Sequence, residues 1–498
     1  MQNTVKQYKA ILAKRNALSH AMGVLSYDSE TAMPKNGAPH MAETMAILSE
    51  ESYKLQVNDE VRALLEKLNA NSESLDEITR REVEEELKQL KKLENVPIEE
   101  YAAYSRLISE ASVKWREAKQ TNDYPLFKPY LERIIAAQKS LMAHMYPGKD
   151  TYDALLEEFS EGLSVKMLDP FFADVKAKLV PVIHAVCQSG NQADDSLLHR
   201  PFPIEGQRKL SEFVMDFLGI DRDSCVIGEV EHPFTTEFNK HDVRLTTHYH
   251  EDDVLSNMFS VAHEGGHCLY ELNMGDELIG SPLSGGATMT LHESQSRLFE
   301  NMICRSREFI ALLYPKMKEI FPGQMAGVSE EMLYRAANKS MPSLIRTEAD
   351  ELTYPLHIMV RYEIEKKLIA GTLSVDELPA EWNRLYKEYL GVDVPDDAHG
   401  VLQDSHWSGG MIGYFPSYCV GSAYSAQIYY NISKEMDIGK IVAAGGVKPI
   451  VEWLTARLYR FGRLKPTAEL TRNVLCGEFD PAYYTDYLTA KFRELYKL

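Results

Sequence analysis

Apolar residues recur at three- and four-residue steps along much of the chain, the spacing of helices with one buried face. Residues 79–97 carry this pattern among many charges, at Val83, Leu87, Leu90 and Leu93. Pro97 ends that run because proline cannot continue a helix. Residues 356–391 are expected to form two helices, with Gly371 at the C-terminal end of the first and Ser374 capping the second.

One region carries a period of two instead, which is typical of strands. The alternating residues are Phe234, Thr236 and Phe238, then Val243, Leu245 and Thr247 after "NKHD". This spacing around a turn predicts a short hairpin. No repeat, low-complexity tract or long linker divides the chain. We therefore expect a mainly α protein, with one large helical domain over residues 1–498 and a small antiparallel β-sheet.

Composition narrows the possible partners. The 498 residues are 44% hydrophobic, and 54 Lys and Arg against 74 Asp and Glu give a net charge of −20. Such an acidic chain is a poor match for nucleic acid or an anionic membrane as its main partner. No run of 18 apolar residues indicates a membrane span. The first 22 residues lack a signal-peptide core, and the six cysteines form no C-x-x-C pair. A cytoplasmic location is expected.

The stretch "SVAHEGGHCLY" lies just after the predicted hairpin. It places His263 and His267 four residues apart, so both imidazoles share one face of a helix. Two such imidazoles can bind one metal ion, and Glu264 then lies where a general base beside a bound water is needed. The alternative is an ordinary amphipathic helix with two surface histidines.

A third ligand is available in "TMTLHESQSRLFENM", which also has helical periodicity. Glu293 in this segment can complete a His₂Glu set and leave one position open for water. The glycines and serines of "SPLSGGA" allow the chain to reverse between the two helices. His292 points about 100° away from Glu293, so we expect it to support the site or to pack beside it.

Two groups of charged residues suit a peptide ligand. His232, Asp242 and Arg244 lie on or beside the predicted hairpin, whose edge could pair with an extended peptide. The alternative is a surface salt bridge. Arg346 and Arg361 lie in or beside apolar helix, and an arginine can bind a C-terminal carboxylate through two hydrogen bonds. The alternative is an internal Arg–Glu network, which is the favoured interpretation for Arg361.

The glycine-rich stretch "GVLQDSHWSGGMIGYFPSY" is a third candidate. It carries Gln403, His406, Tyr414 and Tyr418. A Tyr hydroxyl or a His N–H can donate to the oxyanion that forms when water attacks a carbonyl. The alternative is an aromatic loop buried for stability.

Six of these segments, in this order, carry a resemblance to a known family. They are "HPF", "DVRLT", "HEGGH", "HESQSR", "RTEADELTYPLHI" and "GVLQDSHW". Together they resemble the carboxypeptidase Taq family of metallocarboxypeptidases. The terminal segments "LSYDSETAMPKNG" and "GEFDPAYYTDYL" are similar to the ends of that family, with Tyr27 where a tryptophan is expected.

The resemblance implies a helical fold like that of neurolysin and angiotensin-converting enzyme, with a deep substrate groove, and a homodimer. It implies removal of single residues from peptide C-termini, with broad specificity and poor action on terminal proline. Zinc is the implied metal, and cobalt often supports such enzymes. By the same resemblance, His263, His267 and Glu293 are metal ligands, Glu264 is the general base and His232 positions substrate.

Some assignments stay open under the resemblance. Tyr418 is the first choice and Tyr414 the second for stabilising the oxyanion. Arg346 is the first choice and Arg244 the second for the substrate carboxylate, with Gln403 and His406 as further substrate-binding candidates. Relatives have an acidic residue four positions after the glutamate ligand to support a histidine. Arg297 stands there in this chain, and Glu300 is the candidate for that role.

Two other functions compete with this hypothesis. An endo-acting oligopeptidase would share the metal chemistry without a grip on the terminal carboxylate. A helical binding scaffold with structural zinc would be a protein of another class, although such a site needs no base beside a water. An aminopeptidase is disfavoured because no G-x-M-E-N-like stretch for a free amine is present.

Overall fold

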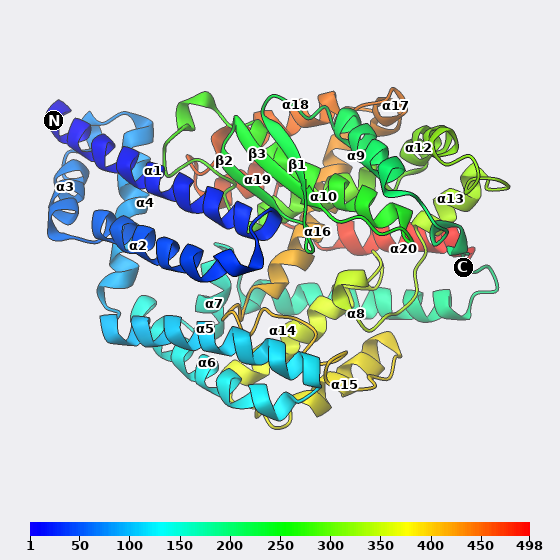
Figure 1. Cartoon of the computed structure of the whole chain (residues 1–498), viewed down its shortest axis with the longest axis horizontal. Helices are drawn as coiled ribbons and strands as arrows, with labels where there is room; N and C mark the ends of the chain where they lie inside the picture. The colour runs from blue at the N-terminus through cyan, green and yellow to red at the C-terminus, as the bar shows by residue number, and fades with distance from the viewer.

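The computed structural model describes residues 1–498, and helices make up most of it. Figure 1 shows the two termini at opposite ends of the long axis. The helices are α1 (Gln2–Thr31), α2 (Ala38–Gln56), α3 (Asp59–Asn69), α4 (Glu77–Glu94), α5 (Ile98–Thr121), α6 (Tyr124–Met145), α7 (Thr151–Phe159), α8 (Val165–Gln188), α9 (Ile204–Leu218), α10 (Val254–Leu272), α11 (Met289–Arg297), α12 (Arg307–Ile320), α13 (Glu330–Ala337), α14 (Tyr354–Ala370), α15 (Leu378–Leu390), α16 (Phe415–Glu435), α17 (Ile438–Ala443), α18 (Lys448–Arg457), α19 (Thr467–Leu475) and α20 (Ala482–Tyr496). The mainly α prediction is confirmed. None of these helices is both long enough and apolar enough to cross a membrane.

Three helices at the N-terminus have a small core of their own. Its eight buried side chains come from α1, α3, α4 and the α3–α4 connection, whereas the main core contains 107 buried residues. Two ion pairs tie α1 to buried acids of α4, Lys9 to Glu82 and Arg15 to Glu86. We call α1, α3 and α4 the N-terminal lobe. The prediction of a single domain over residues 1–498 stays a prediction.

The sheet lies between α1 and the body of the protein (Figure 1). Strands β2 (Thr235–Asn239) and β3 (Asp242–Thr247) form the predicted antiparallel hairpin, which is confirmed. Strand β1 (Cys225–Glu229) pairs with β3 in parallel, so the sheet is mixed and the purely antiparallel expectation is wrong. Its five residues show no clear alternation of burial, which leaves no period-two signal to read. The order β1-β3-β2 leaves β2 at an open edge.

The two predicted helices after residue 350 are α14 and α15. Gly371 ends α14 in the left-handed conformation, with φ of 73°, as predicted. The prediction that Ser374 caps the next helix is wrong. Helix α15 begins at Leu378 with a proline in its first turn, where the missing N–H has no cost. Ser374 instead donates its hydroxyl and backbone N–H to Glu377.

Candidate metal centre

Helix α10 presents the two histidines, and its glycines let it lie against the next helix. Asp253 caps its first turn by accepting from the backbone N–H groups of Leu255 and Ser256. A Cβ on Gly266 would lie 2.6 Å from the Cα of Ser296 in α11. Only a residue without a side chain permits that approach. The second glycine of "HEGGH" therefore brings the helix of Glu293 next to the helix of the histidines.

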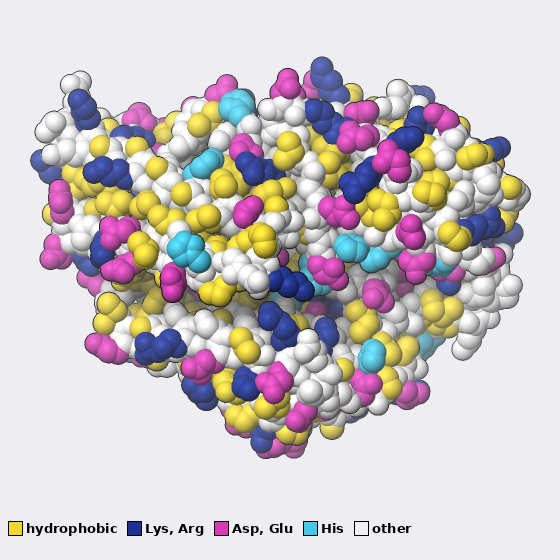
Figure 2. All heavy atoms as spheres, in the orientation of Figure 1, with side chains coloured by type: hydrophobic (Ala, Val, Ile, Leu, Met, Phe, Trp, Pro, Cys, Tyr) yellow, Lys and Arg dark blue, Asp and Glu magenta, His cyan; other side chains and the backbone are white.

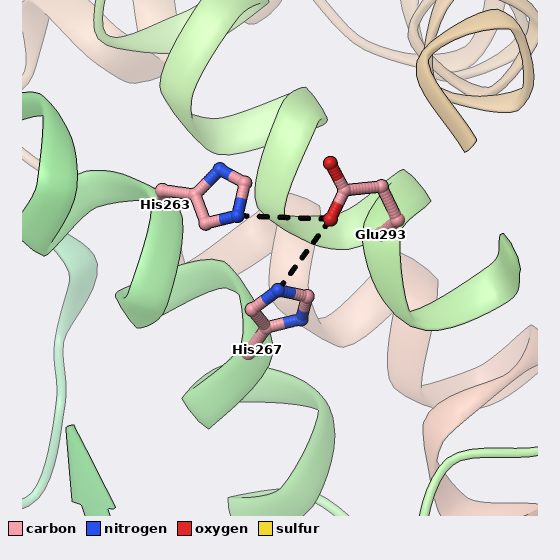
Figure 3. A group of neighbouring side chains, drawn as sticks. All are labelled: His263, His267 and Glu293. Carbon is pink, nitrogen blue, oxygen red and sulfur yellow. Dashed lines mark ion pairs between the residues drawn. The ribbon is translucent and has the colours of Figure 1, made fainter. Parts of the chain in front are cut away.

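Glu293 lies opposite both histidines. One of its carboxylate oxygens, Oε2, is 3.6 Å from Nε2 of His263 and 3.7 Å from Nε2 of His267. Figure 3 shows both lines ending on this same oxygen while the other points away. A Cβ on Gly421 of α16 would lie 2.7 Å from the Cβ of Glu293. Gly266 and Gly421 thus bring α11 close to both neighbouring helices, and Gly421 lies directly against the candidate ligand Glu293.

The three side chains fit a metal ion of the zinc type. One ligand atom from each lies within 4.8 Å of the others. In a tetrahedral site with bonds of about 2.0–2.1 Å, ligand atoms lie about 3.3 Å apart. The observed Nε2–Oε2 separations need only a small contraction to reach that value. Two imidazoles and one carboxylate are also the set that leaves a fourth position open.

In both histidines Nδ1, the ring nitrogen that does not face Glu293, already has a hydrogen-bond partner. Nδ1 of His263 lies 2.9 Å from Oε2 of Glu300, the candidate support named from the sequence. Nε2 is thereby left free for a metal ion, because Nδ1 carries the proton that Glu300 accepts. Glu300 lies in a π-helical turn, Leu298–Ile303, which directly follows α11.

His267 is supported by a histidine and a glutamate in series. Its Nδ1 lies 2.6 Å from Nδ1 of His292, and Nε2 of His292 lies 2.7 Å from Glu271. If His267 binds metal through Nε2, its Nδ1–H donates to His292, whose own Nε2–H then donates to Glu271. His292 thus supports the site, as expected. Glu271 was missed from the sequence, although its place four residues after His267 on one helix was a readable signal.

Glu264 is buried beside the histidines and fixed by the sheet. The hydroxyl of Thr235 in β2 donates to its Oε2 at 2.7 Å. Burial raises the pKa of Glu264, which is the direction that suits a base near neutral pH. Thr235 was not singled out in the sequence, because the period-two pattern marked its neighbours on the other strand face.

Two cavities meet at these residues. We call them the α4-side cavity, of about 640 Å³, and the Arg346-side cavity, of about 700 Å³. Their shared lining is Pro233, His263, Glu264 and Tyr418. Figure 2 shows the surface hollowed between the α1–α2 pair and the α5–α6 pair. A ligand reaching Glu264 can therefore extend in two directions.

Arg346 is buried in the wall of the cavity that carries its name. Its Nε donates to Oδ1 of Asp404 at 2.9 Å, and Nη1 donates to the hydroxyl of Tyr354 at 3.3 Å. A guanidinium has five N–H donors, so both terminal nitrogens keep a donor for a ligand. The other oxygen of Asp404 accepts from fully buried Arg361, the internal network expected for that residue.

The remaining aromatic candidates line or support the same space. Tyr418 lines both cavities and Tyr414 only the α4-side cavity. Nε2 of His406 lies 3.4 Å from the hydroxyl of Tyr418. Burial, with Arg346 nearby, lowers the pKa of His406 to about 4, so this imidazole is neutral at pH 7. His406 therefore contacts Tyr418 as a neutral hydrogen-bonding partner.

Three other predicted residues lie outside the cavities. Arg244 pairs with Asp242 at 2.9 Å and stacks over the ring of Tyr27. His232 is exposed in the loop before β2. Gln403 is buried, where its Oε1 accepts from the backbone N–H of Arg346 and its amide donates to main-chain carbonyls. Gln403 thus holds Arg346 in place, while Arg244 and His232 show no contact with the metal centre.

Gly421→Ala tests whether the close packing of α16 against Glu293 positions that carboxylate for a metal ion. The added methyl group would displace Glu293, so metal affinity is expected to fall about 10–100-fold, the usual effect of disturbing a ligand's support. Competition with a chelator, followed by mass spectrometry of the native protein, measures this. Gly323→Ala is the matched control, because its added methyl group meets nothing within 4 Å. Equal affinity in both variants would contradict the assignment of Glu293 as a ligand.

A helix carrying His-Glu-x-x-His, a third carboxylate on a neighbouring helix and a cavity on each side define the class of helical metallopeptidases. The sequence profile of the carboxypeptidase Taq (M32) metallopeptidase family matches residues 7–492, and the chain belongs to this family.

Relatives and solved structures agree with this assignment. Carboxypeptidase 1 of Bacillus subtilis is 39% identical over 494 residues, 99% of each chain. Thermostable carboxypeptidase 1 of Pyrococcus furiosus is 34% identical and covers 98% of each. The crystal structure of the M32 carboxypeptidase from Deinococcus radiodurans R1 superposes with a TM-score of 0.96 at 32% identity, covering 100% of both chains. The family assignment and the relatives' names identify a metal-dependent peptidase.

Proposed function

We propose that this protein is a zinc carboxypeptidase that releases single amino acids from peptide C-termini. One observation carries the proposal. The Arg346-side cavity is lined by the ligand His263, the base Glu264, Tyr418 and a buried arginine. A carboxylate held by Arg346 would place the last peptide bond beside Glu264, with the released residue in this cavity and the rest of the peptide in the α4-side cavity.

The sheet edge supports this direction. Phe234, Thr235 and Glu237 of the β2 region line the α4-side cavity, and β2 has no strand on its outer side. An extended peptide can pair with such an edge through its main chain. Main-chain pairing depends little on side chains, which fits broad specificity. A terminal proline makes the scissile bond a tertiary amide, with no N–H and a ring that fixes φ, which fits poor action on terminal proline.

Zinc, or cobalt in its place, would be held by His263, His267 and Glu293 and would supply a water of lowered pKa, about 7. Glu264 takes the proton of the attacking water and later passes it to the leaving amine nitrogen. Thr235 holds Oε2 of Glu264, which leaves Oε1 for the proton. The hydroxyl of Tyr418 donates to the carbonyl oxygen as negative charge develops on it. A proton on Nε2 of His406 would keep the Tyr418 hydrogen available for that oxygen.

The test is timed mass spectrometry of one unblocked peptide and of its C-terminal amide. We expect a ladder that loses one C-terminal residue at a time from the free peptide, no ladder from the amide, and loss of both activity and bound metal in chelator. Zinc or cobalt should restore the ladder. Internal fragments from both peptides would indicate the endo-acting oligopeptidase. Metal that only raises the melting temperature, with no cleavage, would indicate a structural site.

Two further properties belong to the same proposal. All six cysteines are free, which fits a reducing compartment, and we infer a cytoplasmic location. We also infer a homodimer, as the family resemblance implies. Helix α2 has no buried residue and exposes Ile47 and Tyr53, which leaves apolar surface available for a second copy. Light scattering at several protein concentrations measures the mass of the assembly.

A further inference from the structure

The two oxygens of the Glu293 carboxylate have different surroundings. Oε2 faces Nε2 of both histidines, as Figure 3 shows. Oε1 faces away and accepts a hydrogen bond of 2.7 Å from Nε of Arg297, one helical turn further along. The hydroxyl of Ser296 donates to the backbone carbonyl of Glu293 at 2.8 Å and lies 3.1 Å from Oε2. Arg297 therefore holds the carboxylate at the oxygen that faces away from the two histidines.

Arg297 is itself fixed in the protein interior. Its guanidinium lies over the ring of Tyr354, 4.5 Å from the centroid. Its Nη1 donates to Oε2 of Glu300 at 3.2 Å, and that same oxygen bonds His263. A rigid planar guanidinium bonded at two points cannot turn away from Glu293 as a flexible ammonium could. Arg297 thus contacts one ligand directly and a second through Glu300.

A carboxylate can bind zinc through one oxygen or through both. Binding through both oxygens would fill space that water and the substrate carbonyl oxygen need during hydrolysis. A charged, buried hydrogen bond to Oε1 opposes that rotation, because the rotation would leave the guanidinium without its partner. Arg297 stands four residues after Glu293 on the same helix, the spacing that lets its guanidinium reach Oε1.

We propose that Arg297 is a positioning residue that keeps Glu293 bound to the metal through Oε2 alone, and so preserves the open coordination positions. The inference rests on the proposed metal function. It adds a role for a residue that acts on the metal site through the candidate ligand Glu293. It also explains why the positively charged Arg297 is buried beside a site for a cation. Its guanidinium is neutralised by two carboxylates, those of Glu293 and Glu300.

The experiment replaces the metal by Co²⁺, whose visible absorption is stronger in four-coordinate than in five- or six-coordinate complexes. In Arg297→Met, Oε1 is free to bind, so we expect weaker cobalt absorption and a kcat about 10–100-fold lower. Arg297→Lys should restore part of both, and guanidinium ion added to Arg297→Ala should restore absorption and activity together. Access is direct, since Arg297 lines the Arg346-side cavity.

Arg305→Met is the matched control. Arg305 also lines this cavity and contacts the other oxygen of Glu300 at 3.3 Å, but it does not touch Glu293. Its loss should leave the cobalt spectrum unchanged. An unchanged spectrum in Arg297→Met, or equal weakening in Arg305→Met, would overturn the inference. A wild-type protein that binds neither Co²⁺ nor Zn²⁺ would instead overturn the proposed function. Circular dichroism of each variant identifies any that does not fold.

Discussion

Glu264→Gln should lower kcat by about 10²–10⁴-fold while the protein keeps its metal, because the amide cannot take a proton from water. The fold should tolerate this change. The hydroxyl of Thr235 can donate to the amide oxygen as it does to Oε2, and a neutral group is easier to bury than a carboxylate. Metal content, melting temperature and kcat measured on the same preparation test the expectation.

The control for this variant is Glu348→Gln. Glu348 is an exposed carboxylate at the Arg346-side cavity, and it makes no contact with Glu264. Its replacement removes the same charge from the same cavity without changing the base. We expect its kcat to stay within about twofold of wild type, as for most surface substitutions. Near-normal turnover in Glu264→Gln would exclude Glu264 as the base. Loss of metal in that variant would show instead a role in holding the site.

Arg346→Met should remove the preference for a free C-terminus. Losing one partner of a buried charge pair costs about 2–5 kcal/mol, so kcat/KM on a free peptide should fall roughly 30- to 5,000-fold. The rate on an amidated peptide, already low, should change little, and the ratio of the two rates should approach one. Paired measurement on the two peptides therefore separates a lost carboxylate grip from a general loss of fold.

Arg244→Met decides between the two arginines named from the sequence. Arg244 pairs with Asp242 outside both cavities, so its loss should leave the ratio of rates on free and amidated peptides unchanged. A collapse of that ratio in Arg244→Met, with Arg346→Met unaffected, would assign the carboxylate to the hairpin instead. The free-peptide assay reports on both variants under the same conditions.

Local spacing in the sequence was enough to predict the three candidate metal ligands, whose ligand atoms the fold brings within 4.8 Å of one another. His263 and His267 share one helix face because they lie one turn apart, and Glu293 lies in a second segment with helical periodicity. These spacings, with the residue types, predict a shared metal site. Such reasoning assumes 3.6 residues per turn. The π-helical turn after Arg297, with the N–H of Cys304 bonded to the carbonyl of Phe299, breaks that assumption. The π-helical turn itself could not be read from spacing, although both carboxylates that Arg297 contacts lie at helical spacings from it, Glu293 four residues before and Glu300 three after.

Contacts between distant segments were also beyond the sequence. Gly266 and Gly421 look like ordinary helical glycines until α11 is found between their helices. Strand β1 joins the sheet through a parallel pairing that depends on the path of the chain, and its five residues carry too little pattern to predict it. In each case the contact is with a segment far away in the sequence, whose position is defined only by the complete fold.

The separate core of the N-terminal lobe has a consequence for how peptide enters. Helix α4 forms one wall of the α4-side cavity, and across it Lys88 meets Glu161 at 3.0 Å and Lys92 meets Glu158 at 2.8 Å. These two ion pairs join exposed or half-buried side chains, so each contributes only about 0–1 kcal/mol to holding the wall in place. Dissolved salt screens such pairs over about 8 Å at physiological ionic strength. If this wall moves when peptide enters, we expect kcat/KM on peptides to rise with ionic strength, which rates measured over a series of salt concentrations test.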